Sequence, residues 1–313
     1  MRNSIDIKKI LVIGSSNTDM VIKSKHIPRI GETILGGNFF MNPGGKGANQ
    51  AVACARLGGD VTFICKTGND IFGNQSKQIF KNEKINTTYV FSDVDEPSGV
   101  ALILVDENAE NCISVASGAN SLLRPVDIKS AEEAIQKADI LLMQLEIPIE
   151  SVELAAKLAK EKGKLVILNP APAPSLQLTE ELLNNIDIII PNETEAETIS
   201  GIKVNDKESA IQAAQRIHEM GVKKVIITLG RKGALLFDGE QIIFFPAFKV
   251  KAIDTTGAGD CFCAALSIAI SEGQNLNDAL KFACKASAIS VTRQGAQSSA
   301  PYRAEVDAWE FIT

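Results

Sequence analysis

Four apolar runs near the middle of the chain carry most of the information on its architecture: ILLMQL (140–145), KLVIL (164–168), IDIIIP (186–191) and KVIITLG (224–230). Each run is short and rich in β-branched residues, as expected of buried strands. Two similar runs, KILVI and VTFI, lie at residues 9–13 and 61–64. Stretches with helical periodicity lie between the runs, at 47–57, 151–162 and 207–220. This alternation predicts an α/β fold, with a doubly wound, mostly parallel sheet sandwiched by helices.

Two stretches interrupt the alternation and are expected to form a small β-sheet lid outside the main sheet. They span residues 19–40 and 98–117. The second contains GVALILVDENAENCISV, which predicts a hairpin that turns at residues 106–111. Neither a sequence repeat nor a linker-like tract separates independent units. We therefore expect one domain, residues 1–313, that carries this lid.

The composition indicates a globular protein that acts away from nucleic acids and membranes. Of the 313 residues, 45% are hydrophobic and 22% are charged, which are ordinary proportions. The formal net charge of −6 provides no general attraction to phosphate backbones or anionic lipids. The apolar run at residues 10–13 is too short for a signal peptide or a membrane span. We expect no nucleic-acid partner, no membrane association and a cytoplasmic location.

Cysteine and histidine usage excludes several kinds of site. The six cysteines form no CxxC pair, so neither a zinc cage nor a disulfide framework is indicated. A Ser-His-Asp hydrolase would need His26 or His218, the only two histidines, and no GxSxG motif accompanies them. Acid–base chemistry therefore falls to carboxylates.

The motif DTTGAGD (254–260), followed by the apolar run CFCAALSIAI, is the strongest chemical signal. Small residues at the start of a helix let backbone N–H groups approach an anion, which the helix dipole also favours. Asp260 would lie in the first helical turn and could accept a proton from a hydroxyl that attacks a bound phosphoryl group. The alternative is that Asp260 only caps the helix. These seven residues alone favour neither reading.

Two further motifs open predicted helices. NPGGKGANQ (42–50) matches neither a P-loop nor a dinucleotide fingerprint and could be an ordinary tight turn. Lys46 and Asn49 favour a polyhydroxylated ligand or a phosphate instead. PNETEAE (191–197) follows a predicted strand, where open α/β sheets bind ligands. A solvated acidic helix start is the alternative there.

Taken together, the motifs resemble the carbohydrate kinases typified by ribokinase, a family that also includes fructokinases and adenosine kinases. The resemblance covers nearly the whole chain, and the motifs occur in the family's order: GSSNTDM (14–20), PGGKGANQA (43–51), QLEIP (144–148), LNPAPA (168–173), PNETEAE (191–197), ITLGRKGA (227–234), DTTGAGD (254–260) and VTRQGAQSS (291–299). It implies ATP-dependent phosphorylation of D-ribose at O5, which yields D-ribose 5-phosphate and ADP.

The resemblance also implies the site residues. Asp260 would be the catalytic base, and Gly257, Ala258 and Gly259 would form the anion hole. The sugar would be held by Asp260 and by Asn17, Thr18, Asp19, Gly45, Lys46, Gly47, Ala48, Asn49 and Glu146. The ATP site would be lined by Asn192, Thr228, Gly230, Arg231, Gly233, Gly259 and Cys284. Glu195 would help to order Mg²⁺ and its waters.

A monovalent-cation site for K⁺ and a homodimer are implied in the same way. The cation would be held, in part by main-chain carbonyls, by Asp254, Thr256, Ser290, Arg293, Gly295 and Ser299. Without the resemblance, residues 290–299 would be read as a helix end and a polar turn. The lid would also pair two subunits. Cys284 departs from relatives that often carry a stronger hydrogen-bonding side chain beside the adenine, since a thiol is a weak donor.

Two alternatives to ribose phosphorylation remain. A related acceptor, such as deoxyribose, fructose or a nucleoside, could share the phosphate machinery. A non-catalytic sugar or nucleotide sensor could keep the fold without turnover, although the retained Asp260 and glycine loop argue against it.

Overall fold

A nine-stranded sheet forms the centre of the molecule in the computed structural model, which describes residues 9–108 and 110–310. In spatial order its strands are β13 (Ile242–Phe245), β12 (Ala234–Phe237), β11 (Lys224–Thr228), β10 (Ile188–Ile189), β9 (Leu165–Leu168), β8 (Ile140–Met143), β1 (Lys9–Ile13), β4 (Asp60–Gly68) and β5 (Val90–Asp93). The pairings from β11 to β5 are parallel, and only β12 runs antiparallel to its neighbours.

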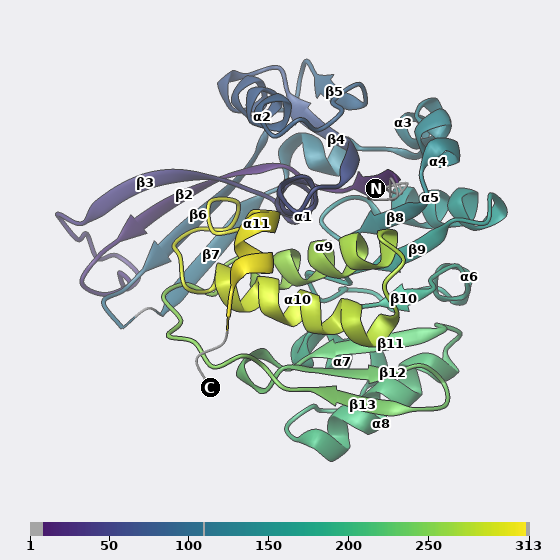
Figure 1. The fold of residues 1–313 in the computed structure, drawn as a ribbon. Helices are drawn as coiled ribbons and strands as arrows, with labels where there is room; N and C mark the ends of the chain where they lie inside the picture. The colour runs from purple at the N-terminus through teal and green to yellow at the C-terminus, as the bar shows by residue number, and fades with distance from the viewer. Residues whose placement is uncertain (1–8, 109, 311–313) are drawn as a thin grey trace.

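Helices cover both faces of this sheet (Figure 1). One face is covered by α1 (Lys46–Arg56), α2 (Ile71–Asn82), α9 (Ala258–Ser271), α10 (Leu276–Ser290) and α11 (Arg303–Ala308). The other is covered by α3 (Pro125–Ser130), α4 (Glu132–Lys137), α5 (Ile149–Glu161), α6 (Glu180–Asn184), α7 (Glu193–Ser200) and α8 (Lys207–Glu219). Two short 3₁₀ helices are η1 (Gly118–Leu122) and η2 (Gly230–Lys232). The predicted doubly wound α/β sandwich is confirmed.

Two hydrophobic cores explain why the central strands read as continuous apolar runs. In β1, Ile10 and Val12 pack into one core, whereas Leu11 and Ile13 pack into the other. All four side chains are at most 1% exposed. Burial of a side chain of this size stabilises the fold by roughly 1.5–3 kcal/mol, so a polar residue at any of these positions would be costly.

Four strands of the main sheet differ from the sequence-based expectation. The run at residues 186–191 yields only the two-residue strand β10, since Pro191 offers no N–H to a ladder. The edge strands β5 and β13 were not among the predicted runs, and neither was β12, which is buried and paired on both sides. The residues of β5 and β13 are partly exposed, so the apolar signal of these two strands is weaker than that of the central strands.

The lid is a separate four-stranded sheet that projects from the body (Figure 1). Its strands, in spatial order, are β3 (Asn38–Gly44), β2 (Asn17–Lys23), β6 (Gly99–Val105) and β7 (Asn111–Ala116). Both stretches predicted to form the lid contribute, and β6 and β7 form the expected hairpin. The lid strands begin at residue 17 and reach residue 44, beyond the predicted bounds. The last of these residues belong to β3, which therefore leads directly into α1.

The order of the strands positions the site. β1 lies between β4 and β8, so the chain leaves β1 toward one side of the sheet and later adds strands on the other. Ligands of open α/β sheets bind outside the carboxyl ends of the strands at such a switch point.

Within residues 9–108 and 110–310, no helix is long and apolar enough to cross a membrane. The expected single domain, 1–313, also includes residues 1–8, 109 and 311–313, which lie outside the described residues, and stays a prediction.

Candidate active site

Asp260 lies at the centre of a polar cluster at the carboxyl ends of the strands. It is the third residue of α9, whose N-cap is Gly257, and it is 7% exposed. Its Oδ2 accepts a hydrogen bond from Asn49 Nδ2, and its Oδ1 accepts one from Gln50 Nε2, both at 2.9 Å. In the described part of the chain, no backbone N–H of α9 donates to this carboxylate. Its contacts are therefore those of a group held by another element, α1, and not those of a helix cap.

Electrostatics around Asp260 oppose one another. Burial raises the pKa of Asp260 above its ordinary value, whereas the Lys46 ammonium and the amides of Asn49 and Gln50 lower it. Burial would lower the pKa of Lys46, but Asp260 and Glu146 outweigh burial and raise it. Lys46 is thus kept protonated next to the carboxylates.

Glu146, which follows β8, binds the loop that opens α1. Its Oε2 accepts hydrogen bonds from the Lys46 N–H at 3.0 Å and from Ser15 Oγ at 2.5 Å. The Ala48 N–H donates to the Ser15 carbonyl at 2.8 Å. The end of β1 and the start of α1 are therefore fixed against each other, with Glu146 between them.

Glycines make this close approach possible. Gly45 has a φ of 87°, in the left-handed region, and a Cβ there would lie 2.7 Å from the Asn17 nitrogen. A Cβ on Gly47 would lie 2.6 Å from the backbone of Gly14 and Ser15. A side chain at either position would push the loop away from the strand ends. The motif is thus a packing requirement as well as a source of ligand donors.

Asn17 and Asp19 reach the cluster from lid strand β2. Asn17 is 5% exposed, and its Oδ1 accepts a hydrogen bond from Asn120 Nδ2 at 2.7 Å. The Asp19 carboxylate lies over Gly44, where a Cβ would approach its oxygens to 2.3 Å. Burial, followed by Glu146 and Asp260, raises the pKa of Asp19 to about 6, and Lys46 partly offsets this. Asp19 therefore gives up its charge at a higher pH than an exposed aspartate does.

The first turn of α9 offers an open glycine surface. Gly257 has a φ of 73°, and a Cβ there would lie 3.0 Å from Ala296. A Cβ on Gly259 would meet nothing within 4 Å, so a ligand can approach this backbone. The unpaired N–H groups and the dipole of a helix start favour an anion. An anion here would lie beside Asp260.

The start of α7 is a capping box and not a solvated acidic turn. Asn192 Oδ1 accepts from the Glu195 N–H at 2.8 Å, and Glu195 Oε2 accepts from the Asn192 N–H at 2.8 Å. Glu195 is only 5% exposed, and burial raises its pKa above the ordinary value, partly offset by the Asn192 N–H and Lys46. Its carboxylate thus shares one electrostatic environment with Lys46 and Asp260.

The other residues expected at the ATP site lie near the end of β11 and on α10. Thr228 forms an isolated parallel bridge with Asn192 and leads into an exposed turn that contains Gly230 and Arg231. Gly233, with a φ of 107°, ends this turn. Cys284 is buried on α10, where burial raises the pKa of its thiol to about 11. One helical turn later on α10, Ser287 Oγ donates to the Ala258 carbonyl at 3.0 Å.

The two loops expected to hold a monovalent cation contact each other. The Gly295 N–H donates to Asp254 Oδ2 at 2.9 Å, and the Thr256 N–H and Oγ1 donate to Asp254 Oδ1 at 2.9 and 2.6 Å. Partial burial raises the pKa of Asp254, but these hydrogen bonds outweigh it and hold that pKa below its ordinary value. The carboxylate therefore fixes both loops beside Gly257.

The side chains of the second loop are already engaged. The Ser290 and Ser299 hydroxyls donate to nearby backbone carbonyls at 2.8 Å, and Arg293 donates to Glu305 at 2.5 and 3.3 Å. In residues 9–108 and 110–310, no group of three or more His, Cys, Asp or Glu side chains could hold a metal ion. A cation here would depend on backbone carbonyl and hydroxyl oxygens, and backbone carbonyls are the ligands that replace the hydration shell of K⁺ in potassium channels.

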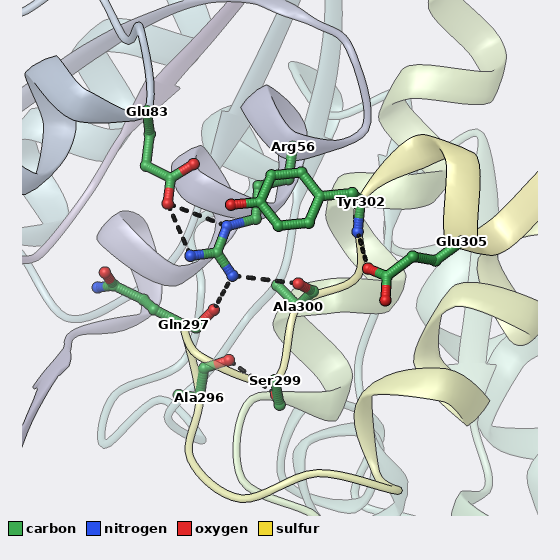
Figure 2. Close-up of polar contacts among 8 residues, drawn as sticks. All are labelled: Arg56, Glu83, Ala296, Gln297, Ser299, Ala300, Tyr302 and Glu305. Atoms are coloured by element: carbon green, nitrogen blue, oxygen red, sulfur yellow. Dashed lines mark hydrogen bonds and ion pairs between the residues drawn. The ribbon is translucent and has the colours of Figure 1, made fainter.

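Arg56, the last residue of α1, joins this helix to the same loop (Figure 2). Its Nε and Nη2 donate to Glu83 Oε1 at 3.0 and 2.6 Å. Its Nη1 donates to the carbonyls of Gln297 at 2.5 Å and Ala300 at 3.1 Å, and the Tyr302 ring centroid lies 5.1 Å from the guanidinium. One end of α1 thus contacts Asp260, and the other end holds the loop that packs against Gly257 at the start of α9.

Sequence reasoning missed several residues that build this cluster: Ser15, Gln50, Arg56, Asn120, Gln144 and Asn169. Two of these, Gln144 and Asn169, directly follow the apolar strands β8 and β9. A polar residue immediately after a buried parallel strand is a readable signal for the ligand-binding edge. The other four make contacts between residues far apart in the sequence, which no local pattern indicates.

Comparisons with known proteins agree with this arrangement. A model of the pfkB family of carbohydrate kinases matches residues 7–303. The ribokinase of Haemophilus influenzae is 47% identical over 298 residues, which cover 95% of this chain and 97% of that protein. A deoxyribokinase of Salmonella typhi is 39% identical over 292 residues, which cover 93% and 95%.

A solved structure is similar over the same extent. The Arabidopsis thaliana ribokinase complexed with ribose and ATP has a TM-score of 0.90 and 34% sequence identity, and the match covers 96% of this chain and 97% of that one. The family model and both enzymes thus extend over nearly the whole chain, as the motif order predicts. The chain belongs to the pfkB family of carbohydrate kinases.

Proposed function

We propose that this protein transfers the γ-phosphate of ATP to O5 of D-ribose and releases D-ribose 5-phosphate and ADP. The observation that carries the proposal is the placement of Asp260. Its buried carboxylate directly follows an open glycine turn and is held by two residues in the first turns of α1, Asn49 and Gln50. The similarity to ribokinases from several organisms supports ribose as the acceptor.

In this mechanism Asp260 accepts the proton of the O5 hydroxyl as the oxygen attacks the γ-phosphorus. The backbone N–H groups of Gly257, Ala258 and Gly259 would face the negative charge that develops on the phosphoryl oxygens. The Ala258 N–H, which donates to the Thr255 carbonyl at 3.2 Å, would exchange that hydrogen bond for one to the phosphoryl group. Asn17, Asp19, Lys46, Asn49 and Glu146 orient the sugar, together with the backbone of Thr18, Gly45, Gly47 and Ala48. The lid excludes water when the sugar is bound.

The nucleotide is proposed to lie between the end of β11 and α10. Asn192, Thr228, Gly230, Arg231, Gly233, Gly259 and Cys284 would line its site. The buried Glu195 carboxylate fits a role near Mg²⁺, because this ion is usually held by few carboxylates with phosphate and water. Mg²⁺ would neutralise charge on the ATP phosphates. A cytoplasmic location also stays a prediction.

The acceptor is tested by steady-state kinetics on a panel of sugars and adenosine. We expect kcat/KM for ribose to exceed that for fructose and for adenosine by roughly 100-fold or more, since buried polar groups left unpaired by the wrong acceptor raise the barrier. The panel includes 2-deoxyribose, because a relative that is 39% identical is a deoxyribokinase. Faster turnover of deoxyribose or of the nucleoside would contradict the assignment.

The role of Asp260 is tested with Asp260→Asn. We expect kcat to fall roughly 10²–10⁴-fold, since the basic oxygen is lost while the shape is kept. The matched control is Asp278→Asn. Asp278 is also the third residue of its helix, α10, but its side chain is 56% exposed. The Asp278→Asn variant should keep the wild-type kcat. Thermal unfolding of both variants separates folding from catalysis.

A sensor that lacks turnover would bind ribose and ATP without releasing ADP. ADP release by the wild-type protein in the presence of ribose would exclude a sensor, and binding without release would support one. Near-normal kcat in Asp260→Asn would leave the proposed mechanism without its base. In either case the family assignment would stand, because it depends on similarity over the whole chain.

We also propose that K⁺ binds between the Asp254 and Thr256 loop and the second loop at Ser290, Arg293, Gly295 and Ser299. K⁺ at about 100 times its Kd would stabilise the protein by about 2.7 kcal/mol relative to a bulky organic cation, or roughly 5 °C in Tm. Asp254→Asn should abolish this difference.

Asp238→Asn is the matched control for the potassium experiment, because Asp238 likewise accepts backbone N–H groups in an exposed turn, at 2.8 and 3.1 Å. It should retain the K⁺ response. Equal Tm values and equal turnover in potassium and in the organic cation, at matched ionic strength, would remove the cation site from the proposal.

The lid is proposed to pair two copies of the chain. Ile22, Phe39, Met41 and Leu102 share one face of the lid by strand register, and they are between 40% and 60% exposed. Asp19 points to the opposite face, toward the site. A contiguous apolar face of this kind is typical of an interface.

Sedimentation velocity tests the pairing. Leu102→Glu should convert a dimer to a monomer, since it buries an unpaired charge in the interface. Val94→Glu, which alters an apolar side chain that is 81% exposed and lies outside the lid strands, should not. A monomeric wild-type protein at micromolar concentration would refute the proposal.

A further inference from the structure

Three buried side-chain amides lie beneath Asp260 and have no role in the mechanism above. They are Gln50 on α1, Gln144 directly after β8 and Asn169 directly after β9, and we call them the amide chain. Gln50 and Gln144 are fully buried, and Asn169 is 7% exposed. Because buried amides are costly unless each polar atom is paired, their arrangement is informative.

The hydrogen bonds define the orientation of each amide. The Ile190 carbonyl can only accept, so the Asn169 atom 2.9 Å away is Nδ2, and Asn169 Oδ1 is left as an acceptor. Gln50 Nε2 lies 3.1 Å from that Oδ1 and 2.9 Å from Asp260 Oδ1. Both are acceptors, so the Gln50 nitrogen must face them. Gln144 Nε2 then donates to Gln50 Oε1 at 2.5 Å.

The orientation of the Gln144 amide leaves one of its polar atoms unpaired, which costs free energy. Gln144 Oε1 is buried and has no hydrogen-bond partner among the described residues. It lies over Gly14, where a Cβ would approach it to 2.0 Å. A 180° turn of the Gln144 amide would not help, because its oxygen would then face the oxygen of Gln50. The unpaired oxygen is therefore the consequence of an arrangement in which Gln144 donates to Gln50 and Gln50 donates to Asp260.

We propose that Gln50 is a positioning residue for the phosphoryl transfer: held by Gln144 and Asn169, its amide fixes the rotation of the Asp260 carboxylate and favours the ionised form. This rests on the proposed function, in which Asp260 is the base. Asn49 and Gln50 bind separate carboxylate oxygens, so the carboxylate plane is fixed at two points. Hydrogen bonds to the charged form of an acid stabilise that form.

The charged neighbours of Asp260 explain why a neutral donor is needed. Lys46 on α1 favours the ionised carboxylate. Glu146 after β8, Asp19 on the lid and Glu195 on α7 face it and oppose ionisation, as do the Cys261 and Cys263 thiols on α9 if ionised. The single ammonium is shared among several carboxylates. A buried amide stabilises one oxygen of Asp260 whatever charge these neighbours carry.

The proposal is tested with Gln50→Met, which preserves length and burial but removes the donor. In the variant, the acidic limb of the kcat–pH profile should lie roughly one to two pH units above its wild-type position. The reason is that loss of a hydrogen bond to the charged form raises the pKa of Asp260. At a given pH on that acidic side, kcat should fall roughly 10- to 100-fold, as a shift of one to two units implies. The KM for ribose should change little, because Gln50 lies beneath the base. Gln144→Met should shift the same limb in the same direction by less.

Cys54→Ala is the matched control. Cys54 lies one turn after Gln50 on α1, is fully buried, and contacts α9 with its Sγ 3.8 Å from the Ala264 carbonyl. This variant disturbs the same helix interface without touching Asp260. It should lower Tm and leave the acidic limb in place. If Gln50→Met fails to fold, Gln144→Met tests the chain from its other end.

Asp260→Asn, measured in parallel, separates the two levels of inference. An inactive Asp260→Asn together with folded Gln50→Met and Gln144→Met variants that keep the wild-type kcat and acidic limb would overturn the role of Gln50 alone. Normal turnover in Asp260→Asn would overturn the proposed base, and the role of Gln50 with it. A shifted limb in Gln50→Met, an unshifted limb in Cys54→Ala and an inactive Asp260→Asn would support both.

Discussion

Asp260 places a carboxylate in the interior of the protein, and a buried carboxylate is stable only where donors and opposite charge replace the water it has lost. Here the replacements come from one helix. Lys46, Asn49 and Gln50 all lie within the first turns of α1. The geometry of α1 relative to α9 is therefore the constraint on which the rest of the site depends.

The backbone satisfies that constraint through absent side chains. α1 can approach the strand ends only because Gly47 packs directly on the backbone of Gly14 and Ser15, and because Gly14 leaves room for Gln144. A methyl group at either glycine would be closer than van der Waals contact allows. At the far end of α1, Arg56 holds the loop that packs against Gly257 at the start of α9. A single rigid helix thus links the glycine loop at Gly45, the Asp260 carboxylate and the first turn of α9.

The central strands and the glycine motifs could be predicted from the sequence, because they depend on local properties. These properties are apolar runs long enough to be buried on both faces and small residues at helix starts. The hydrogen bond between Asp260 and Gln50 could not be predicted, because the two residues are 210 positions apart and no local pattern relates them. The choice between a helix cap and a held carboxylate was open from DTTGAGD alone, since both need an aspartate after glycine. The contacts with α1 distinguish them. The edge strands were also missed, because half-buried residues give a weaker pattern.

The electrostatics of the cluster also connect the lid to the base. Asp19 belongs to lid strand β2, yet its carboxylate and that of Asp260 raise each other's pKa. A neutral sugar that enters between them brings hydroxyl donors without adding charge. These donors can pair with Asp19 and Glu146, so that Lys46 is shared less widely and Asp260 keeps more of its stabilisation. Because like-charge repulsion inside a low-dielectric site is large, pairing the outer carboxylates favours ionisation of the inner one. Sugar binding and activation of the base would then be the same electrostatic event.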